Sequence, residues 1–148
     1  MASRNAAKMY ARVGLETGVF AANPHQLVLM LFDGALLAVS DADAHMREGR
    51  IADKGEALSR AISIINDGLR ASLDHTKGGK IAGYLLELYD YMSRRLVLAG
   101  LKNDRGALLE VARLLGELRT SWAAIGGAAT QHVVSAAASS GLTRHAAA

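Results

Sequence analysis

Apolar residues spaced three or four positions apart are the dominant pattern of this chain. In its last third they are Leu108, Val111, Leu115, Leu118, Trp122 and Ile125. The same spacing runs from Leu58 to Leu73 and from Ile81 to Leu96. It places apolar side chains on one stripe of an amphipathic helix, whereas the two-residue alternation of an exposed strand is missing from the sequence. The pattern therefore predicts a helix in each of these three segments.

The longest apolar run, residues 23–39, is consistent with two structures. Asp33-Gly34 in its middle is a β-hairpin signal, whereas Asn23-Pro24 followed by Gln26 is the capping arrangement that starts a helix. A helix explains one further regularity, because polar residues recur every seven positions: Gln26, Asp33, Ser40 and Arg47. We therefore predict a helix from Pro24 to Arg47, in which Gly34 marks the close approach of a neighbouring backbone.

The four predicted helices are separated by three short breaks, at residues 48–52, 74–80 and 100–104. Helices of similar length joined by short loops form an antiparallel up-and-down bundle, so we expect an all-α four-helix bundle at residues 23–126. Residues 1–22 are expected to form an N-terminal arm with a short cap helix near 6–12. The Ala- and Ser-rich residues 127–148 are expected to form a disordered, mobile tail.

Each predicted helix carries more apolar residues than the stripe facing a bundle core requires. The surplus residues are mostly large on the first and third helices and mostly small on the second and fourth. Small side chains leave a shallow groove and large ones supply anchors, which favours binding of an amphipathic helix or an extended apolar peptide. Alternatively, the N-terminal arm, splayed helices or a homodimer bury the same flanks. The candidate binding residues are Leu29, Phe32, Ala61, Ile64, Gly68, Tyr84, Tyr91, Leu98 and Leu109.

The composition of the chain argues against a secreted, disulfide-bonded or membrane-inserted protein. The chain has 148 residues, of which 17 are Lys or Arg and 14 are Asp or Glu, and the two signs are interspersed. The lack of cysteine excludes disulfides and thiolate metal sites. The N-terminus has no apolar core of a signal peptide, and the run at 23–39 is shorter than the ~20 residues of a membrane span. We therefore expect a cytosolic protein that does not insert into membranes.

The sequence makes no case for an enzyme or a bound cofactor. The five histidines are scattered, and no glutamate is followed by a histidine three residues later, as a di-iron bundle requires. Gly78-Gly79-Lys80 is the nearest approach to a phosphate-binding loop, and a simple turn between helices explains it. We expect neither catalytic residues nor a metal site.

Three segments resemble the family of flagellin-specific export chaperones of bacterial flagella, the flagellar secretion chaperone FliS. They are PHQLVLMLFDGAL, GGKIAGYLLELYDYMSRRL and LLGELRTSW, and they follow an N-terminal tyrosine, Tyr10. The resemblance covers roughly residues 6–125, and it is specific because the motifs occur together in one order. Phe32 stands where tyrosine is common in the family, and Gly100 stands where asparagine is common, although glycine also suits the end of a helix.

The resemblance implies a cytosolic four-helix bundle that binds the C-terminal segment of flagellin in apolar surface grooves. Capping that segment prevents premature polymerisation, and the complex is handed to the export gate of the flagellar type III apparatus. The resemblance also implies that the N-terminal arm occupies part of the same surface when no client is present. It thereby adds Tyr10 and Val13 to the client-binding candidates.

Two other classes of protein are alternatives. One is a self-associating helical bundle that acts as a structural or adaptor protein, with its apolar flanks buried in a homodimer. The other is a nucleic-acid-binding regulator that uses Arg4, Lys8, Arg12 and Arg94-Arg95. The lack of a basic cluster with base-stacking aromatics argues against nucleic acid as a partner.

Overall fold

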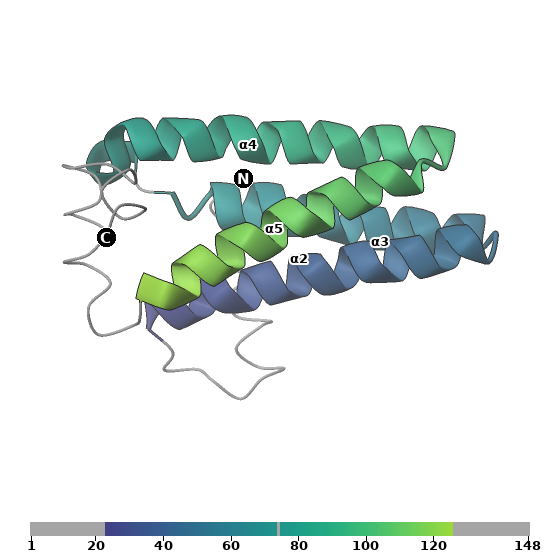
Figure 1. The fold of residues 1–148 in the computed structure, drawn as a ribbon, viewed down its shortest axis with the longest axis horizontal. Coiled ribbons are helices and arrows are strands. Elements are labelled where there is room, and N and C mark those ends of the chain that lie inside the picture. The colour runs from purple at the N-terminus through teal and green to yellow at the C-terminus, as the bar shows by residue number, and fades with distance from the viewer. Residues whose placement is uncertain (1–22, 74, 126–148) are drawn as a thin grey trace.

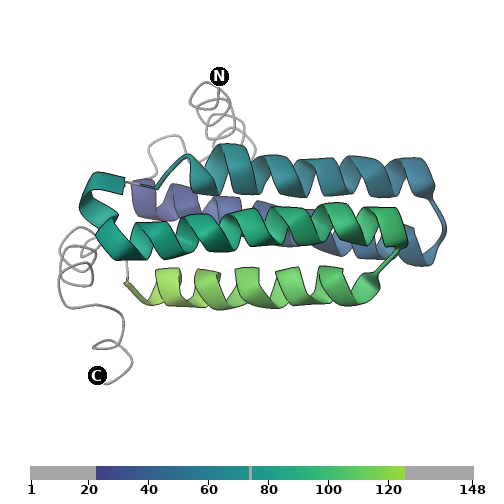
Figure 2. The same cartoon turned by 90° about the horizontal axis from the view of Figure 1, so that it is seen from above.

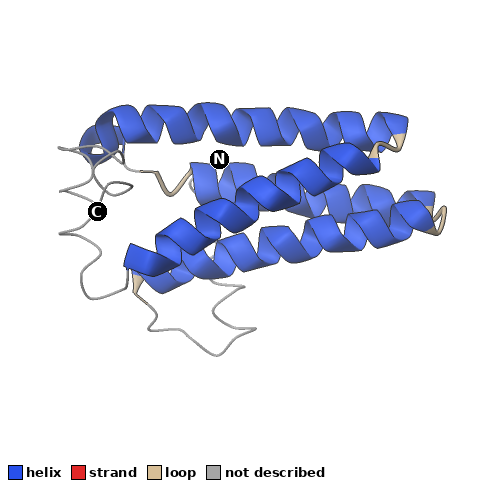
Figure 3. Cartoon of the chain, viewed as in Figure 1, coloured by secondary structure: helices blue, strands red, loops and turns tan. Residues whose placement is uncertain are grey.

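The computed structural model describes residues 23–73 and 75–125 of the chain. The predicted N-terminal arm, with Tyr10 and Val13, and the predicted tail at 127–148 lie outside these residues. The described part is helical and contains no strand, as Figure 3 shows. Its elements are α2 (Pro24–Arg47), α3 (Ile51–Ser63), the π-helical η1 (Ile64–Arg70), α4 (His75–Lys102) and α5 (Arg105–Ile125).

The helices run alternately in opposite directions and form the predicted all-α bundle (Figure 1). Helix α2 packs against α3 and α5, and α4 packs against η1, α3 and α5. Helices α2 and α4 are therefore diagonal to each other, and α4 lies along the upper edge in Figure 1 and nearest the viewer in Figure 2. Short connections between antiparallel neighbours give this up-and-down topology.

Helix α2 has the predicted bounds because its sequence encodes both ends. The Asn23 side chain accepts a hydrogen bond from the Gln26 backbone N–H at 2.9 Å, and Pro24 begins the helix. Gly49 follows the helix with a φ of 72°, which lets the Arg50 N–H reach the carbonyl of His45 at 2.9 Å. This left-handed residue closes the helix in a Schellman motif. The predicted polar stripe of α2 is exposed.

The second and third helices depart from the predicted pattern. The second helix changes at Ile64 from α- to π-helical winding, which apolar spacing alone did not predict. Helical backbone resumes at His75, inside the predicted break, and Gly79 interrupts it with a φ of 54° and a ψ of −128°. The glycine pair therefore marks the bend, and the long straight part of α4 follows it.

Gly100 does not end α4, which continues to Lys102. Asn103 is the terminating residue, with a φ of 52°, and the Asp104 N–H bonds the Ala99 carbonyl at 3.0 Å. Gly100 instead permits close packing, because a Cβ there would lie 2.8 Å from Leu58 Cδ1. The buried Lys54 Nζ also donates to the Gly100 carbonyl at 3.0 Å and to Asn103 Oδ1 at 2.7 Å, and thereby caps this negative helix end.

One continuous core joins the four helices. The apolar residues of α2 opposite its polar stripe are buried or half-buried: Val28, Leu31, Ala35, Ala38 and Ala42. The largest fully buried side chains of the core are Leu31, Val39, Ile65, Leu69, Met92, Leu96, Leu108, Val111 and Leu115. Burying such side chains contributes roughly 1.5–3 kcal/mol each before the entropy of ordering is subtracted.

The prediction that Phe32, Ala61 and Gly68 lie on accessible flanks is wrong, because Phe32 is only 3% exposed and Ala61 0%, and Gly68 is also buried. A Cβ on Gly68 would lie 2.9 Å from Leu31 Cδ2, so this small residue admits α2 rather than an external segment. Gly34 does not mark a close backbone either. The nearest atom to a Cβ there is Ile64 Cδ1, at an ordinary contact distance of 3.4 Å.

Candidate binding surfaces

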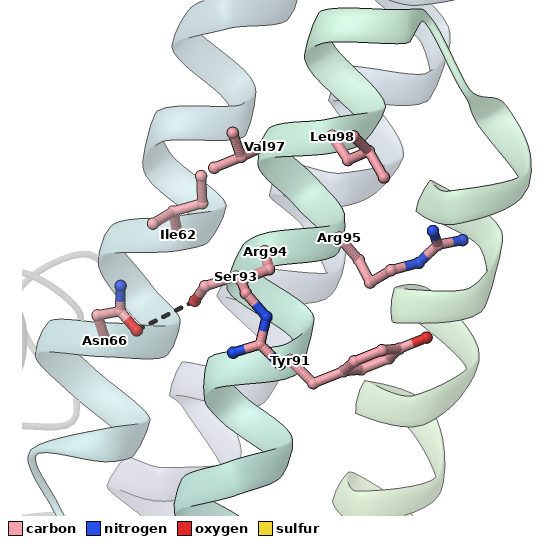
Figure 4. A pocket seen from close by; sticks show the side chains of 8 residues that line it. All are labelled: Ile62, Asn66, Tyr91, Ser93, Arg94, Arg95, Val97 and Leu98. Carbon is pink, nitrogen blue, oxygen red and sulfur yellow. Dashed lines mark hydrogen bonds between the residues drawn. The ribbon is translucent and has the colours of Figure 1, made fainter.

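Several exposed apolar residues lie on the outward side of α4. Three of the six strongly exposed large hydrophobic residues lie on this helix: Tyr84 at 68%, Val97 at 50% and Leu101 at 77%. Val97 also lines an open depression of about 690 Å³ (Figure 4). Its lining consists of Ile62 of α3, Asn66 of η1 and six residues of α4: Tyr91, Ser93, Arg94, Arg95, Val97 and Leu98.

Hydrogen bonds fix four of the polar side chains around this depression: Asn66, Tyr91, Ser93 and Arg95. Ser93 Oγ donates to Asn66 Oδ1 at 3.0 Å, which joins α4 to η1. On the α5 side, the Tyr91 hydroxyl and Arg95 Nε donate to Glu110 at 2.5 and 2.7 Å. The bond from Tyr91, followed by that from Arg95, holds the pKa of Glu110 below its ordinary value, and the same contact with Glu110 raises the pKa of Tyr91. The tyrosine ring is thus held in one orientation beside the depression.

A second apolar stripe lies on α5. Leu109 is 58% exposed, and Ala123 is also exposed. Gly116 lies between them on the helix and has no atom within 4 Å of the position of a Cβ. The stripe is therefore shallow and open, as predicted for the small residues of the last helix.

Two bidentate ion pairs join α5 to α2. Arg119 Nε and Nη2 donate to Asp33 at 2.5 and 3.3 Å, and Arg105 Nε and Nη2 donate to Asp43 at 2.6 and 3.2 Å. The bonds from Arg105, with the further charge of Arg47, lower the pKa of Asp43. The carboxylate neighbours raise the pKa of Arg105 and of Arg119.

At the end of the bundle, His25 and Trp122 bond each other reciprocally. The Trp122 indole N–H donates to the His25 carbonyl at 2.9 Å, and His25 Nε2–H donates to the Trp122 carbonyl at 2.8 Å. Their rings are stacked with centroids 5.3 Å apart. The two residues thereby fix the start of α2 against the last turn of α5.

Comparison with known proteins identifies the family. The family described as flagellar protein FliS matches residues 6–129. The flagellar secretion chaperone FliS of Salmonella typhimurium is 52% identical over 115 residues, which cover 78% of this chain and 85% of that protein. The chaperone of the same name from Escherichia coli is 43% identical, covering 76% and 83%, and that of Bacillus subtilis is 34% identical, covering 72% and 78%. The chain belongs to the FliS family.

In this FliS family member, the sequence-predicted binding residues fall into separate environments. Tyr84 and Leu109 are exposed, and Leu29, Ile64, Tyr91 and Leu98 are half-buried. Only Tyr91 and Leu98 line the same depression. Ile64 packs toward Gly34 of α2, and Leu109 lies on α5. The candidates therefore belong to several surfaces rather than one groove.

Sequence reasoning also missed three exposed apolar residues: Ile51, Val97 and Leu101. Val97 and Leu101 are four residues apart, on the side of α4 that carries the polar residue Arg94. A search for large apolar residues within the polar stripe, rather than beside it, would have found them.

No cluster of three or more potential metal ligands occurs in residues 23–73 and 75–125. No helix of that same part is long and apolar enough to span a membrane. The family is one of secretion chaperones, and a chaperone acts through its binding surfaces.

Proposed function

We propose that this FliS family member binds the C-terminal segment of newly made flagellin in the cytosol. Capping that segment prevents premature polymerisation, and the complex is passed to the export gate of the flagellar type III apparatus. The relatives named as flagellar secretion chaperones support this assignment. The observation that carries it is the exposure of large apolar side chains, including Tyr84 and Leu109, on a folded bundle.

The proposed client surface extends over more than one helix. Tyr84, Tyr91 and Leu98 lie on α4, whereas Leu109 lies on α5 and Leu29 on α2. A segment that contacts all three helices has to pass around the bundle instead of lying in one groove. Tyr10 and Val13 belong to this proposal through the family resemblance alone.

Burial of apolar area supplies the free energy of binding in this proposal. Each Å² of apolar surface removed from water contributes about 25 cal/mol, and ordering of a client that is disordered when free offsets part of the gain. Binding is therefore expected to show a negative change in heat capacity.

Calorimetric titration of the full chain with the flagellin C-terminal segment tests the proposal. Tyr84→Asp and Leu109→Asp are each expected to weaken binding about tenfold or more, because a carboxylate would replace an apolar side chain that the bound client buries. Both side chains are exposed in the free protein, so the thermal unfolding midpoint should be unchanged. Lack of any binding to the segment would refute the proposed function.

Leu37→Asp is the matched control. Leu37 is 64% exposed on α2 and is not among the proposed contacts. If this variant weakens binding as strongly as Leu109→Asp, the assignment of the client surface to the residues named above is wrong.

A further inference from the structure

We propose that Glu110 of α5 is a positioning residue for client binding, which holds the Tyr91 ring of α4 in the orientation that meets the client. This role rests on the proposed function, because Tyr91 is one of the proposed flagellin-binding residues. Glu110 itself is assigned no contact with the client. It acts through the hydroxyl of Tyr91, and Arg95 in turn holds Glu110.

The three side chains form one hydrogen-bonded cluster that bridges α4 and α5. The Tyr91 hydroxyl donates to Glu110 Oε2 at 2.5 Å, and Arg95 Nε donates to Glu110 Oε1 at 2.7 Å. Both oxygens of the carboxylate are therefore bonded, each to a different residue of α4. Tyr91 and Arg95 are four residues apart, so they lie on one side of α4, and Figure 4 shows both side chains directed toward α5.

The cluster is sheltered enough for its bonds to restrict the ring. The side chains of Arg95 and Glu110 are each 28% exposed, and Tyr91 is half-buried and packs against the core. Hydrogen bonds that involve an ionised group are stronger than neutral ones, and a low local dielectric strengthens them further. The bond between Tyr91 and Glu110 also lowers the pKa of the carboxyl and raises the pKa of the phenol, as expected where an ionised carboxylate accepts a phenolic proton.

The bond to Glu110 determines which part of Tyr91 a client can contact. A tyrosine hydroxyl has one proton to donate, and here the carboxylate accepts it. The ring carbons remain available beside the depression, which Tyr91 lines together with Leu98. Tyr91 thus presents an apolar surface in a fixed position, while its hydroxyl is used within the bundle.

Ordering the ring before the client arrives reduces the entropic cost of binding. A side chain that is free in the unbound protein and fixed in the complex loses rotamer freedom, and this loss weakens binding. The bond to Glu110 has already ordered the Tyr91 ring in the free bundle. Loss of Glu110 is therefore expected to weaken binding about two- to tenfold.

Calorimetric titration of the full chain with the flagellin C-terminal segment measures this effect. Glu110→Ala removes the carboxylate and Tyr91→Phe removes the hydroxyl, so both should lower the affinity by that same factor. Glu110→Gln should bind like the natural chain, because the side-chain amide keeps one bond to Tyr91 and one to Arg95. Glu117→Ala is the matched control and should leave the affinity unchanged. Glu117 is exposed on the same helix and pairs with Arg113 at 3.3 Å.

A double-variant cycle distinguishes positioning of Tyr91 from a general loss of structure. In a Tyr91→Ala background, Glu110→Ala should cause no further loss of affinity, because the ring through which Glu110 acts is missing. Tyr91→Leu serves as the background if Tyr91→Ala does not fold. An equal loss of affinity with and without the Tyr91 ring would overturn the proposal. Unchanged or tighter binding by Glu110→Ala would also overturn it, because the freed hydroxyl would then bond the client.

The free chain tests the same positioning without a client. NMR relaxation of isotope-labelled tyrosine should show an ordered Tyr91 ring in the natural chain and a more mobile ring in Glu110→Ala. Equal order in both proteins would refute the role of Glu110. If the segment does not bind even the natural chain, the proposed function fails and this role fails with it. If the segment binds the natural chain and Glu110→Ala equally well, only the role of Glu110 fails.

Discussion

The Asp43 carboxylate is held by two arginines. Its side chain is 15% exposed, and it accepts two bonds from Arg105 and a contact from Arg47 at 3.3 Å. These groups lower the pKa of Asp43 from its ordinary 3.8. Because the folded pKa is the lower one, the stabilisation is present above the unfolded pKa and is lost as pH falls through the folded pKa.

Asp43→Asn tests this contribution. At neutral pH the variant is expected to lose about 1 kcal/mol of unfolding free energy, the magnitude of a partly buried bidentate pair. The difference from the natural chain should shrink as pH falls below about 4, where the unfolded carboxyl becomes protonated. Urea unfolding at several pH values measures it, with Glu56→Gln as the exposed control. A difference that persists at the lowest pH would contradict the ion-pair explanation.

At the scale of elements, the contacts between helices determine at which glycines a side chain can be added. Gly68 of η1 lies against Leu31 of α2, and a Cβ there would lie 2.9 Å from Leu31 Cδ2, so Leu31 would have to shift to admit a methyl group. Gly116 of α5 faces open space. Both lie within helical segments, yet only the first is required by a neighbouring helix.

The two glycines therefore respond oppositely to the same substitution. Gly68→Ala is expected to destabilise the bundle by about 1–3 kcal/mol, because the new methyl group would overpack against Leu31. Gly116→Ala is expected to stabilise it by up to about 1 kcal/mol through helix propensity. Chemical denaturation of both variants checks this pair of predictions. If Gly116→Ala destabilises the protein, another group must occupy the space beside Gly116.

The same helices show which structural features could be predicted from the sequence and which could not. The bounds of α2 were predictable because a cap, a proline and a seven-residue polar stripe all indicate one helix. The role of Gly68 was not, because a small residue permits either an external groove or close packing of the bundle's own helices. Only the position of Leu31 in space distinguishes these outcomes. The exposed Val97 and Leu101 were missed for a related reason, since a helical pattern does not reveal which face a neighbour covers.

For the whole molecule, the up-and-down topology explains why apolar residues remain accessible. Each helix has two neighbours in the ring, so its outward side has no covering layer among the described residues. Core residues face inward from all four helices, and Tyr84, Leu101 and Leu109 face outward. Bundle stability and binding surfaces thus use different sides of the same helices, which is why surface variants are expected to fold.

The contact between His25 and Trp122 has a topological consequence. Because α2 starts beside the last turn of α5, the chain traces an almost closed loop (Figure 1). A circular permutant that links residue 125 to residue 23 and opens the chain at Gly49 would keep every helix in place. We expect it to unfold cooperatively, as circular dichroism can measure. The natural order of the helices along the chain is then one of several orders that give the same bundle.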